Sequence, residues 1–144
     1  MKEIESFLEE IRKWAELRND IKAILLVGSY ARGQVHDGSD IDLVLMTNEP
    51  DRYLNDYSFT ENFGDVDKIE KEYWGRVTSL RIWYKDGREV ELGITGPDWI
   101  TDDPLDIGTL RTITGGAKVV IDRIGNIDEI IASASRVGRR LRIR

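Results

Sequence analysis

A pair of motifs set in two short apolar runs constrains the fold of this chain most. The run over residues 21–27 is followed at once by Gly28 and Ser29, and a second run carries Asp40 and Asp42 with one apolar residue between them. Apolar runs of this length predict buried β-strands. Because side chains alternate between the two faces of a strand, the two acids share one face, about 7 Å apart along the backbone. Their apolar neighbours then face a core.

The two acidic side chains indicate a metal site. Carboxylates held this close repel each other unless a cation lies between them, and a divalent cation is the usual solution. Gly28 and Ser29 open a short helix after the first strand, where backbone N–H groups and the helix dipole favour phosphate. Alone, each motif is ordinary, because glycine–serine turns often cap helices and paired acids are often solvated. Together, at this spacing, they favour a metal–triphosphate site.

The absence of cysteine and the presence of a single histidine narrow the chemistry available to the chain. Disulfides and thiolate metal ligands are excluded, and zinc sites and histidine-based nucleophilic triads are nearly so. Carboxylates are left as the metal ligands, which favours Mg²⁺ and, next to it, Mn²⁺. We interpret His36, in the polar turn between the two motifs, as a surface residue and not as a catalytic base.

The length of 144 residues predicts one domain over residues 1–144, with one core and no separate substrate domain. No apolar run approaches the length of a membrane span, and the first six residues lack the apolar core of a signal peptide. We therefore expect a cytoplasmic protein that does not bind membranes.

The net charge of −6 is unevenly distributed along the chain. The last nine residues hold five arginines and no acid, so the first 135 residues carry a net charge of −11. Such an acidic body argues against nucleic acid as a partner. We interpret the basic end as a solvated helix end, with a contact to phosphate or to a partner as the alternative. Its arginines are Arg136, Arg139, Arg140, Arg142 and Arg144.

A second concentration of charge lies at residues 49–72, which hold eight acids and three basic residues. This segment is either ordinary solvated surface, the default interpretation, or a rim that favours a cationic acceptor. Asp65 and Asp67 repeat the spacing of the first acidic pair. No phosphate-binding turn precedes them, so we do not expect a site there.

A hairpin supplies a third acid. An Asp-Gly turn joins the alternating segments 77–84 and 88–94, which is a strong hairpin signal. In the second arm Glu89, Glu91 and Gly93 share the face opposite to the apolar residues. Glu91 is the better candidate because it lies in mid-strand, and the neighbouring glycine leaves room for a ligand to approach.

The other segments follow the helical and strand patterns of a small mixed domain. Residues 3–18 place apolar side chains at spacings of three and four, which predicts an amphipathic helix on the core. Further helices are expected at 50–57, 104–113 and 127–141, and a short strand at 118–121.

The segments Gly28–Gly33 and Ser39–Leu43 resemble the signature of the DNA polymerase beta-like nucleotidyltransferase superfamily, in particular its small stand-alone bacterial and archaeal members and its antibiotic-modifying enzymes. Residues 90–92 resemble the third acidic strand of that superfamily, and the likeness covers about residues 22–95. It implies an α/β (α+β) fold with a mixed central sheet and flanking helices.

The resemblance also assigns residues to the donor substrate. Gly28 and Ser29 would hold the triphosphate of a nucleoside triphosphate, with ATP as the expected donor. Arg32 could reach a phosphate oxygen as a cation, or stand exposed on the short helix without a role.

By the same resemblance, Asp40 and Asp42 would coordinate Mg²⁺ that bridges the phosphates. Glu91 would complete the acidic triad as a metal ligand or as the base for the acceptor hydroxyl, with Glu89 as the alternative. In-line displacement at phosphorus independently needs charge neutralisation and an activated oxygen, which two cations about 4 Å apart supply. The number of metals is left open.

The implied function is transfer of a nucleoside monophosphate, AMP from ATP, to a hydroxyl with release of pyrophosphate. Larger members of the superfamily carry a helical domain for the acceptor, and this chain has no counterpart. The acceptor could be a cationic small molecule such as an aminoglycoside. It could also be a partner protein, because small members can act as antitoxins that adenylylate a partner toxin.

Two further expectations concern assembly and an alternative class of function. A homodimer or a complex with a small helical protein is compatible with the sequence. A noncatalytic nucleotide-binding module would keep the same fold without turnover, but the presence of all three acids argues against it.

Overall fold

The computed structural model describes residues 2–36 and 38–141, so Arg142 and Arg144 of the basic end lie outside the described residues. This part contains the strands β1 (Ile21–Val27), β2 (Ile41–Thr47), β3 (Val66–Trp74), β4 (Val77–Tyr84), β5 (Glu89–Thr95) and β6 (Ala117–Asp122). Its helices are α1 (Lys2–Glu16), α2 (Gly28–Arg32), α3 (Pro50–Leu54), α4 (Asp98–Thr101), α5 (Ile107–Thr114) and α6 (Ile127–Leu141), with a 3₁₀ helix η1 (Ser58–Phe63).

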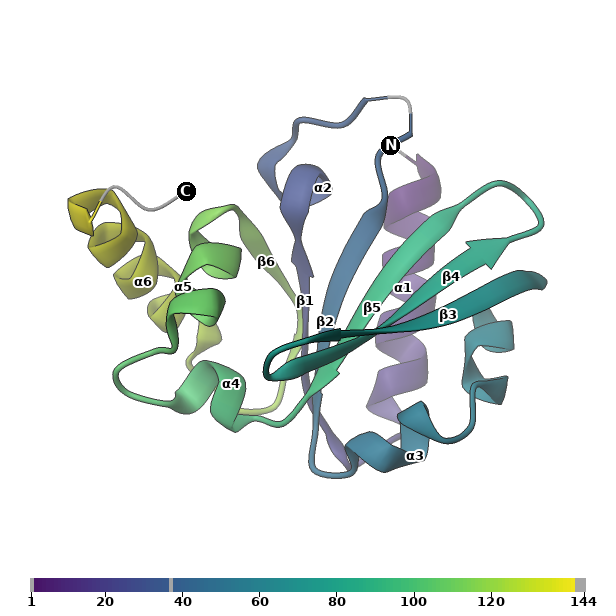
Figure 1. Cartoon of the computed structure of the whole chain (residues 1–144), viewed down its shortest axis with the longest axis horizontal. Coiled ribbons are helices and arrows are strands. Elements are labelled where there is room, and N and C mark those ends of the chain that lie inside the picture. Colours follow the sequence, from purple (N-terminus) through teal and green to yellow (C-terminus); the bar gives the residue numbers. More distant parts are fainter. Residues whose placement is uncertain (1, 37, 142–144) are drawn as a thin grey trace.

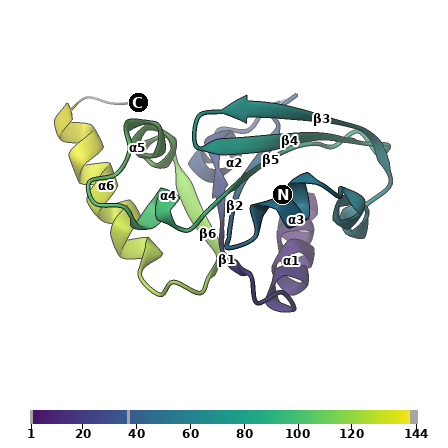
Figure 2. The ribbon, with the colours of Figure 1, turned by 60° about the horizontal axis from the view of Figure 1, so that its bottom comes forward.

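The six strands form one mixed sheet with the order β3-β4-β5-β2-β1-β6. Strands β2 and β5 pair in parallel, and the other neighbours are antiparallel. Helix α1 covers one face of the sheet, and α4, α5 and α6 lie on the other side (Figures 1 and 2). The expected mixed sheet with flanking helices is therefore confirmed.

Alternation along the central strands divides the core into two clusters. Leu43 and Leu45 of β2 face α1, whose Phe7, Ile11 and Trp14 are buried against them. On the opposite face, Val44 and Met46 of β2 join a second buried cluster. Helical residues of that cluster are Trp99, Ile100, Leu110, Ile113, Ile127 and Ala134.

The second cluster leaves part of its sheet face open. Its strand residues come only from β1 and β2, with Val77 of β4 and residues of β6 packed at its margin. On β4 and β5 the same face carries Arg81, Glu91 and Gly93, paired across the two strands. The candidate site lies on this open part of the sheet.

Four elements differ from the sequence expectations. Strand β3 and helix α4 were not expected, and the helix expected over residues 50–57 ends at Leu54. The helix expected at 104–113 begins at Ile107, because the side chain of Asp106 caps it by accepting a hydrogen bond from the N–H of Gly108 at 3.0 Å.

A buried polar contact at Asp20 joins the ends of the two central strands to α3. Its carboxylate accepts hydrogen bonds from the hydroxyl of Thr47 at 2.8 Å and from that of Tyr53 at 2.6 Å. Arg52 donates a third at 3.0 Å. Charge-assisted hydrogen bonds thus stabilise the ends of β1 and β2 that lie away from the candidate site.

No helix within the described residues is long and apolar enough to cross a bilayer. His36 is exposed in the turn between α2 and β2, as expected for a surface residue.

Candidate active site

The two motifs that open the sequence argument meet in space. Asp42 lies on β2 and is paired with Val27 of β1 on one side and with Glu91 of β5 on the other. Gly28, directly after β1, has a positive φ of 75°, and a Cβ atom on it would lie 2.5 Å from Oδ2 of Asp42. Only glycine fits this approach without moving the carboxylate.

The carboxylate of Asp42 is half-buried and accepts no hydrogen bond or ion pair from any described residue. Burial, together with the negative charges of Glu91 and Asp40, raises the pKa of Asp42 to about 7, against the opposing effects of Arg81 and Arg32. A buried acid without a partner is costly when it is ionised. It gains most from a cation that arrives with a ligand.

Arg81 of β4, which no sequence motif indicates, lies among the carboxylates other than Asp42. Its guanidinium donates to Asp40 at 2.8 Å and to Glu91 at 2.9 Å. Longer contacts of 3.2 and 3.4 Å reach Glu89 and Glu72. The hydrogen bond to Asp40 is the main cause of a raised pKa of Arg81, which stays charged. The pairing of Arg81 with Glu91 across the hairpin was the available signal, once the Asp-Gly turn set the register.

The structure separates the two candidates for the third acid. Glu91 is paired with Asp42 in the parallel β2–β5 register and lines the same pocket. Glu89 also contacts Arg81, but it is paired with Trp83 next to the turn of the hairpin and does not line that pocket. Burial raises the pKa of Glu91, with Glu72 and Asp40 adding to the shift and Arg81 opposing it. Glu91 is therefore the better placed of the two.

The donor set fits a divalent cation at Asp42. Carboxylate oxygens are the donors that hard cations prefer, and those of Asp42 accept no hydrogen bond or ion pair from another described residue. As the side chains stand, however, no three acidic or histidine residues of the described part converge on one ion position. Asp40 and Glu91 are instead engaged by Arg81.

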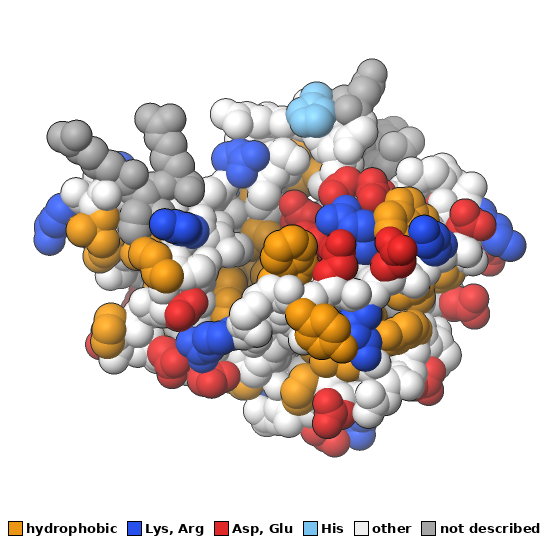
Figure 3. Space-filling model, in the orientation of Figure 1, with side chains coloured by type: hydrophobic (Ala, Val, Ile, Leu, Met, Phe, Trp, Pro, Cys, Tyr) orange, Lys and Arg blue, Asp and Glu red, His pale blue; other side chains and the backbone are white. Residues whose placement is uncertain are grey.

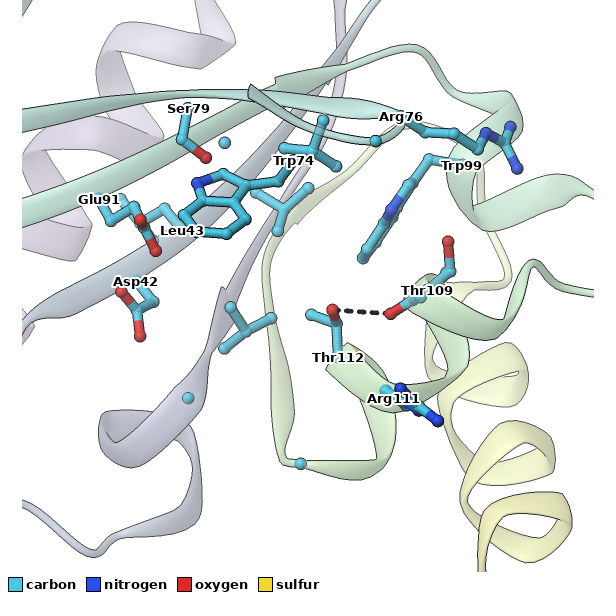
Figure 4. Close-up of a pocket in the computed structure, with 18 of the residues that line it drawn as sticks. Asp42, Leu43, Trp74, Arg76, Ser79, Glu91, Trp99, Thr109, Arg111 and Thr112 are labelled. Atoms are coloured by element: carbon cyan, nitrogen blue, oxygen red, sulfur yellow. Dashed lines mark hydrogen bonds between the residues drawn. The ribbon is translucent and has the colours of Figure 1, made fainter. Parts of the chain in front are cut away.

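A pocket of about 730 Å³ opens beside Asp42 and Glu91. Figure 4 shows these two acids on one side and Thr109, Arg111 and Thr112 of α5 across from them. Its walls also include Trp74 at the end of β3 and Trp99 from α4. A volume in this range suits a nucleotide-sized ligand.

The structure gives a packing reason for a glycine at position 93. It lines the pocket, but a Cβ atom on it would lie 2.7 Å from a methyl carbon of Val77 on the neighbouring strand. The missing side chain therefore makes room for Val77 at the pocket wall, and the space that it leaves for a ligand stays a prediction.

The residues expected to bind phosphate lie on or next to helix α2, beside the pocket. Helix α2 has five residues, which confirms the short helix expected there, and a helix this short has only a weak dipole. Gly28 and Arg32 line the pocket, and the half-exposed Ser29 lies between them on α2. The Nη1 of Arg32 donates to the carbonyl of Gly115 at 2.8 Å, which ties α2 to the turn before β6.

A family model described as a nucleotidyltransferase domain matches residues 2–90, which is more than half of the chain. The chain belongs to this nucleotidyltransferase family. The expected superfamily is thereby confirmed. The matched range includes Gly28, Ser29, Arg32, Asp40 and Asp42. It ends one residue before Glu91, so the third acid rests on the geometry alone.

Two solved structures are similar to this nucleotidyltransferase domain. An aminoglycoside 6-adenyltransferase from Bacillus subtilis is 14% identical, with a TM-score of 0.47 over 65% of this chain and 36% of that one. The polymerase core of TRAMP, an RNA surveillance complex, is 18% identical, with a TM-score of 0.46 over 64% of this chain and 29% of that one. The chain thus spans about a third of either protein. No curated protein matches it.

The charged segments of this nucleotidyltransferase domain contribute unequally to the site. Glu72, from the acidic segment 49–72, reaches Arg81, and acidic side chains gather on this face over β4 and β5 (Figure 3). Asp65 and Asp67 are exposed at the start of the edge strand β3, away from the pocket wall. Arg136, Arg139 and Arg140 are exposed on α6.

Proposed function

We propose that this chain transfers a nucleoside monophosphate, AMP from ATP, to a hydroxyl group and releases pyrophosphate. One observation carries the proposal: the unpartnered carboxylate of Asp42 lies against Gly28 at the wall of a nucleotide-sized pocket. This arrangement joins a metal ligand to a backbone that a phosphate can approach closely. Family membership supports nucleotidyl transfer in general.

On the donor side, Gly28 and Ser29 bind the triphosphate through their backbone, and Arg32 offers its remaining N–H groups to a phosphate oxygen. Asp42 would hold Mg²⁺, with Asp40, which Arg81 engages, beside it, and the ion would neutralise the triphosphate and activate the attacking oxygen. Trp74, which is 61% exposed at the pocket wall, offers a flat apolar surface for the nucleobase, which supports placing the base between Trp74 and α5.

In the transfer step, the acceptor hydroxyl oxygen bonds to the α-phosphorus of ATP. The bond from that phosphorus to the bridging oxygen of the β-phosphate breaks, and pyrophosphate leaves. Glu91 takes the hydroxyl proton, a role that its raised pKa supports because a base works best when its pKa lies nearer to the working pH.

The acceptor that the charges favour is a cationic small molecule. Asp40, Asp42, Glu72, Glu89 and Glu91 lie on one open face, and the cation Arg81 contacts all of them except Asp42. This surplus of negative charge attracts a polyamine-like or aminoglycoside-like acceptor. We propose further that residues 1–144 act as one nucleotidyltransferase domain, because both core clusters pack on the same sheet.

The test is Mg²⁺-dependent pyrophosphate release from ATP across a panel of aminoglycosides and polyamines. Asp42→Asn should abolish release, because it removes the free carboxylate. Asp67→Asn is the matched control: it alters the other Asp-x-Asp pair, which lies outside the pocket wall, and should leave release unchanged. Equal activity of the wild type and Asp42→Asn would overturn the proposal. Release that needs a protein acceptor would redirect it to the partner-protein alternative.

A further inference from the structure

We propose that Arg81 is a built-in cation that takes the place of a second metal ion, so that the site binds a single divalent cation at Asp42. The inference rests on the proposed function, because it concerns the metal that nucleotidyl transfer requires. It adds a residue to the site that no motif assigns.

The position of Arg81 is set by three strands. It is paired with Glu91 across the β4–β5 hairpin, and Glu89 lies two residues earlier on the same face of β5. Glu72 approaches from β3, and Asp40 directly precedes β2. The side chain is only 22% exposed. A guanidinium held from so many directions by charged acceptors is a fixed part of the sheet face.

The contacts divide the carboxylates into two groups. Four of them contact the guanidinium: Asp40 at 2.8 Å, Glu91 at 2.9 Å, Glu89 at 3.2 Å and Glu72 at 3.4 Å. Asp42 has no such contact within the described chain. Arg81 therefore occupies the space between Asp40 and Glu91 that a second ion would need. The space beside Asp42 stays available.

Displacing Arg81 would leave Glu72 and Glu89 without their cation. A second divalent ion would have to compete with the guanidinium for Asp40 and Glu91 and also compensate these two acids. A buried or half-buried carboxylate that loses its partner is strongly unfavourable. One ion at Asp42, with Arg81 retained, satisfies more of the acids at once.

The experiment counts bound Mn²⁺ by electron paramagnetic resonance, in the presence of a saturating ATP analogue with a methylene bridge between the α- and β-phosphorus. The full chain should bind one Mn²⁺ and show no spin-coupled pair. Arg81→Gln should bind two, with the coupled signal of neighbouring ions. Because the local charge becomes one unit more negative, the first ion should also bind about tenfold more tightly.

Two control variants keep the test decisive. Arg76→Gln makes the same change in charge, but Arg76 pairs with Asp98 and Asp102 of the α4 region, so it should still bind one ion. Arg81→Lys keeps the charge but cannot bridge Asp40 and Glu91 with one ammonium group, so it should gain a weaker second site. Circular dichroism confirms folding, and Arg81→Lys carries the test if Arg81→Gln does not fold.

The outcomes separate the inference from the proposed function. Two coupled ions in the wild type, or a single ion in both Arg81 variants, would overturn the role of Arg81 and leave nucleotidyl transfer intact. No bound Mn²⁺ in any variant would overturn the metal-dependent function and this inference with it. One ion in the wild type and in Arg76→Gln, with two in Arg81→Gln, supports the inference.

Discussion

Gly28→Ala tests the contact on which the candidate site depends. The substitution has two costs. Gly28 has a φ of 75°, and a left-handed conformation costs alanine about 1–2 kcal/mol. Its Cβ would also lie 2.5 Å from Oδ2 of Asp42, so the carboxylate must move by about 0.9 Å to reach the 3.4 Å of an ordinary van der Waals contact.

Gly33→Ala is a matched control at the other end of the same helix. Gly33 has a φ of 72°, and no atom lies within 4 Å of the position of its Cβ. The two variants therefore share the backbone cost, and only Gly28→Ala displaces Asp42. We expect a loss of about 1–2 kcal/mol for Gly33→Ala and about 2–3 kcal/mol for Gly28→Ala, since an off-rotamer side chain adds about 1 kcal/mol.

The assays are urea unfolding for stability and pyrophosphate release for activity. A shift of catalytic groups approaching 1 Å costs about 100-fold in rate, so Gly28→Ala should be nearly inactive. Gly33→Ala should keep its activity in proportion to its folded fraction. Equal loss of activity in both variants, or full activity in Gly28→Ala, would refute the claim that Gly28 is required for the position of Asp42.

Three further predictions concern charge, stability and the nucleobase. The pKa of Asp42 is raised to about 7, so the folded state binds more protons than the unfolded state between about pH 4 and 7. The free energy of unfolding therefore falls as pH rises through that window. In urea unfolding from pH 4 to 8, Asp42→Asn should remove this slope and be about 1–2 kcal/mol more stable than the wild type at pH 8, after allowance for solvent screening. Asp20→Ala should lower the free energy of unfolding by about 3 kcal/mol in the same urea experiment, because it leaves the hydroxyl of Tyr53 without its buried acceptor. An unchanged unfolding midpoint would contradict this. Trp74→Ala should weaken binding of the ATP analogue about tenfold in calorimetry and leave binding of inorganic tripolyphosphate unchanged. Tyr73→Ala is the control: Tyr73 is an exposed neighbour that does not line the pocket, so this variant should bind the ATP analogue like the wild type.

The central part of the fold could be predicted because its patterns are unambiguous. The apolar runs of β1 and β2 match strands that are buried on both faces, and the Asp-Gly turn correctly joins β4 and β5. Strand β3 could not be predicted in the same way. It lies at the edge of the sheet and contains no buried residue. Its sequence therefore lacks the regular apolar alternation that marks a strand with one buried face.

The site was predictable where motifs carry it and not where tertiary packing does. Gly28 and Asp42 do meet, as the paired motifs implied. Arg81 was missed because an arginine within a strand is usually a solvated residue, and its partners come from three other strands. The wall formed by Trp74 and α5 depends on how the C-terminal helices pack, which no local pattern encodes.

The fate of each phosphorus of ATP tests the proposed activity most directly. The wild type is incubated with Mg²⁺, a cationic acceptor panel and ATP labelled at either the α- or the γ-phosphorus, and the acceptor is then isolated. Nucleotidyl transfer predicts that the α label becomes covalently bound to the acceptor, that the γ label leaves as pyrophosphate, and that Asp42→Asn loses both signals. A γ label on the acceptor, or an α label that persists in Asp42→Asn, would contradict the account.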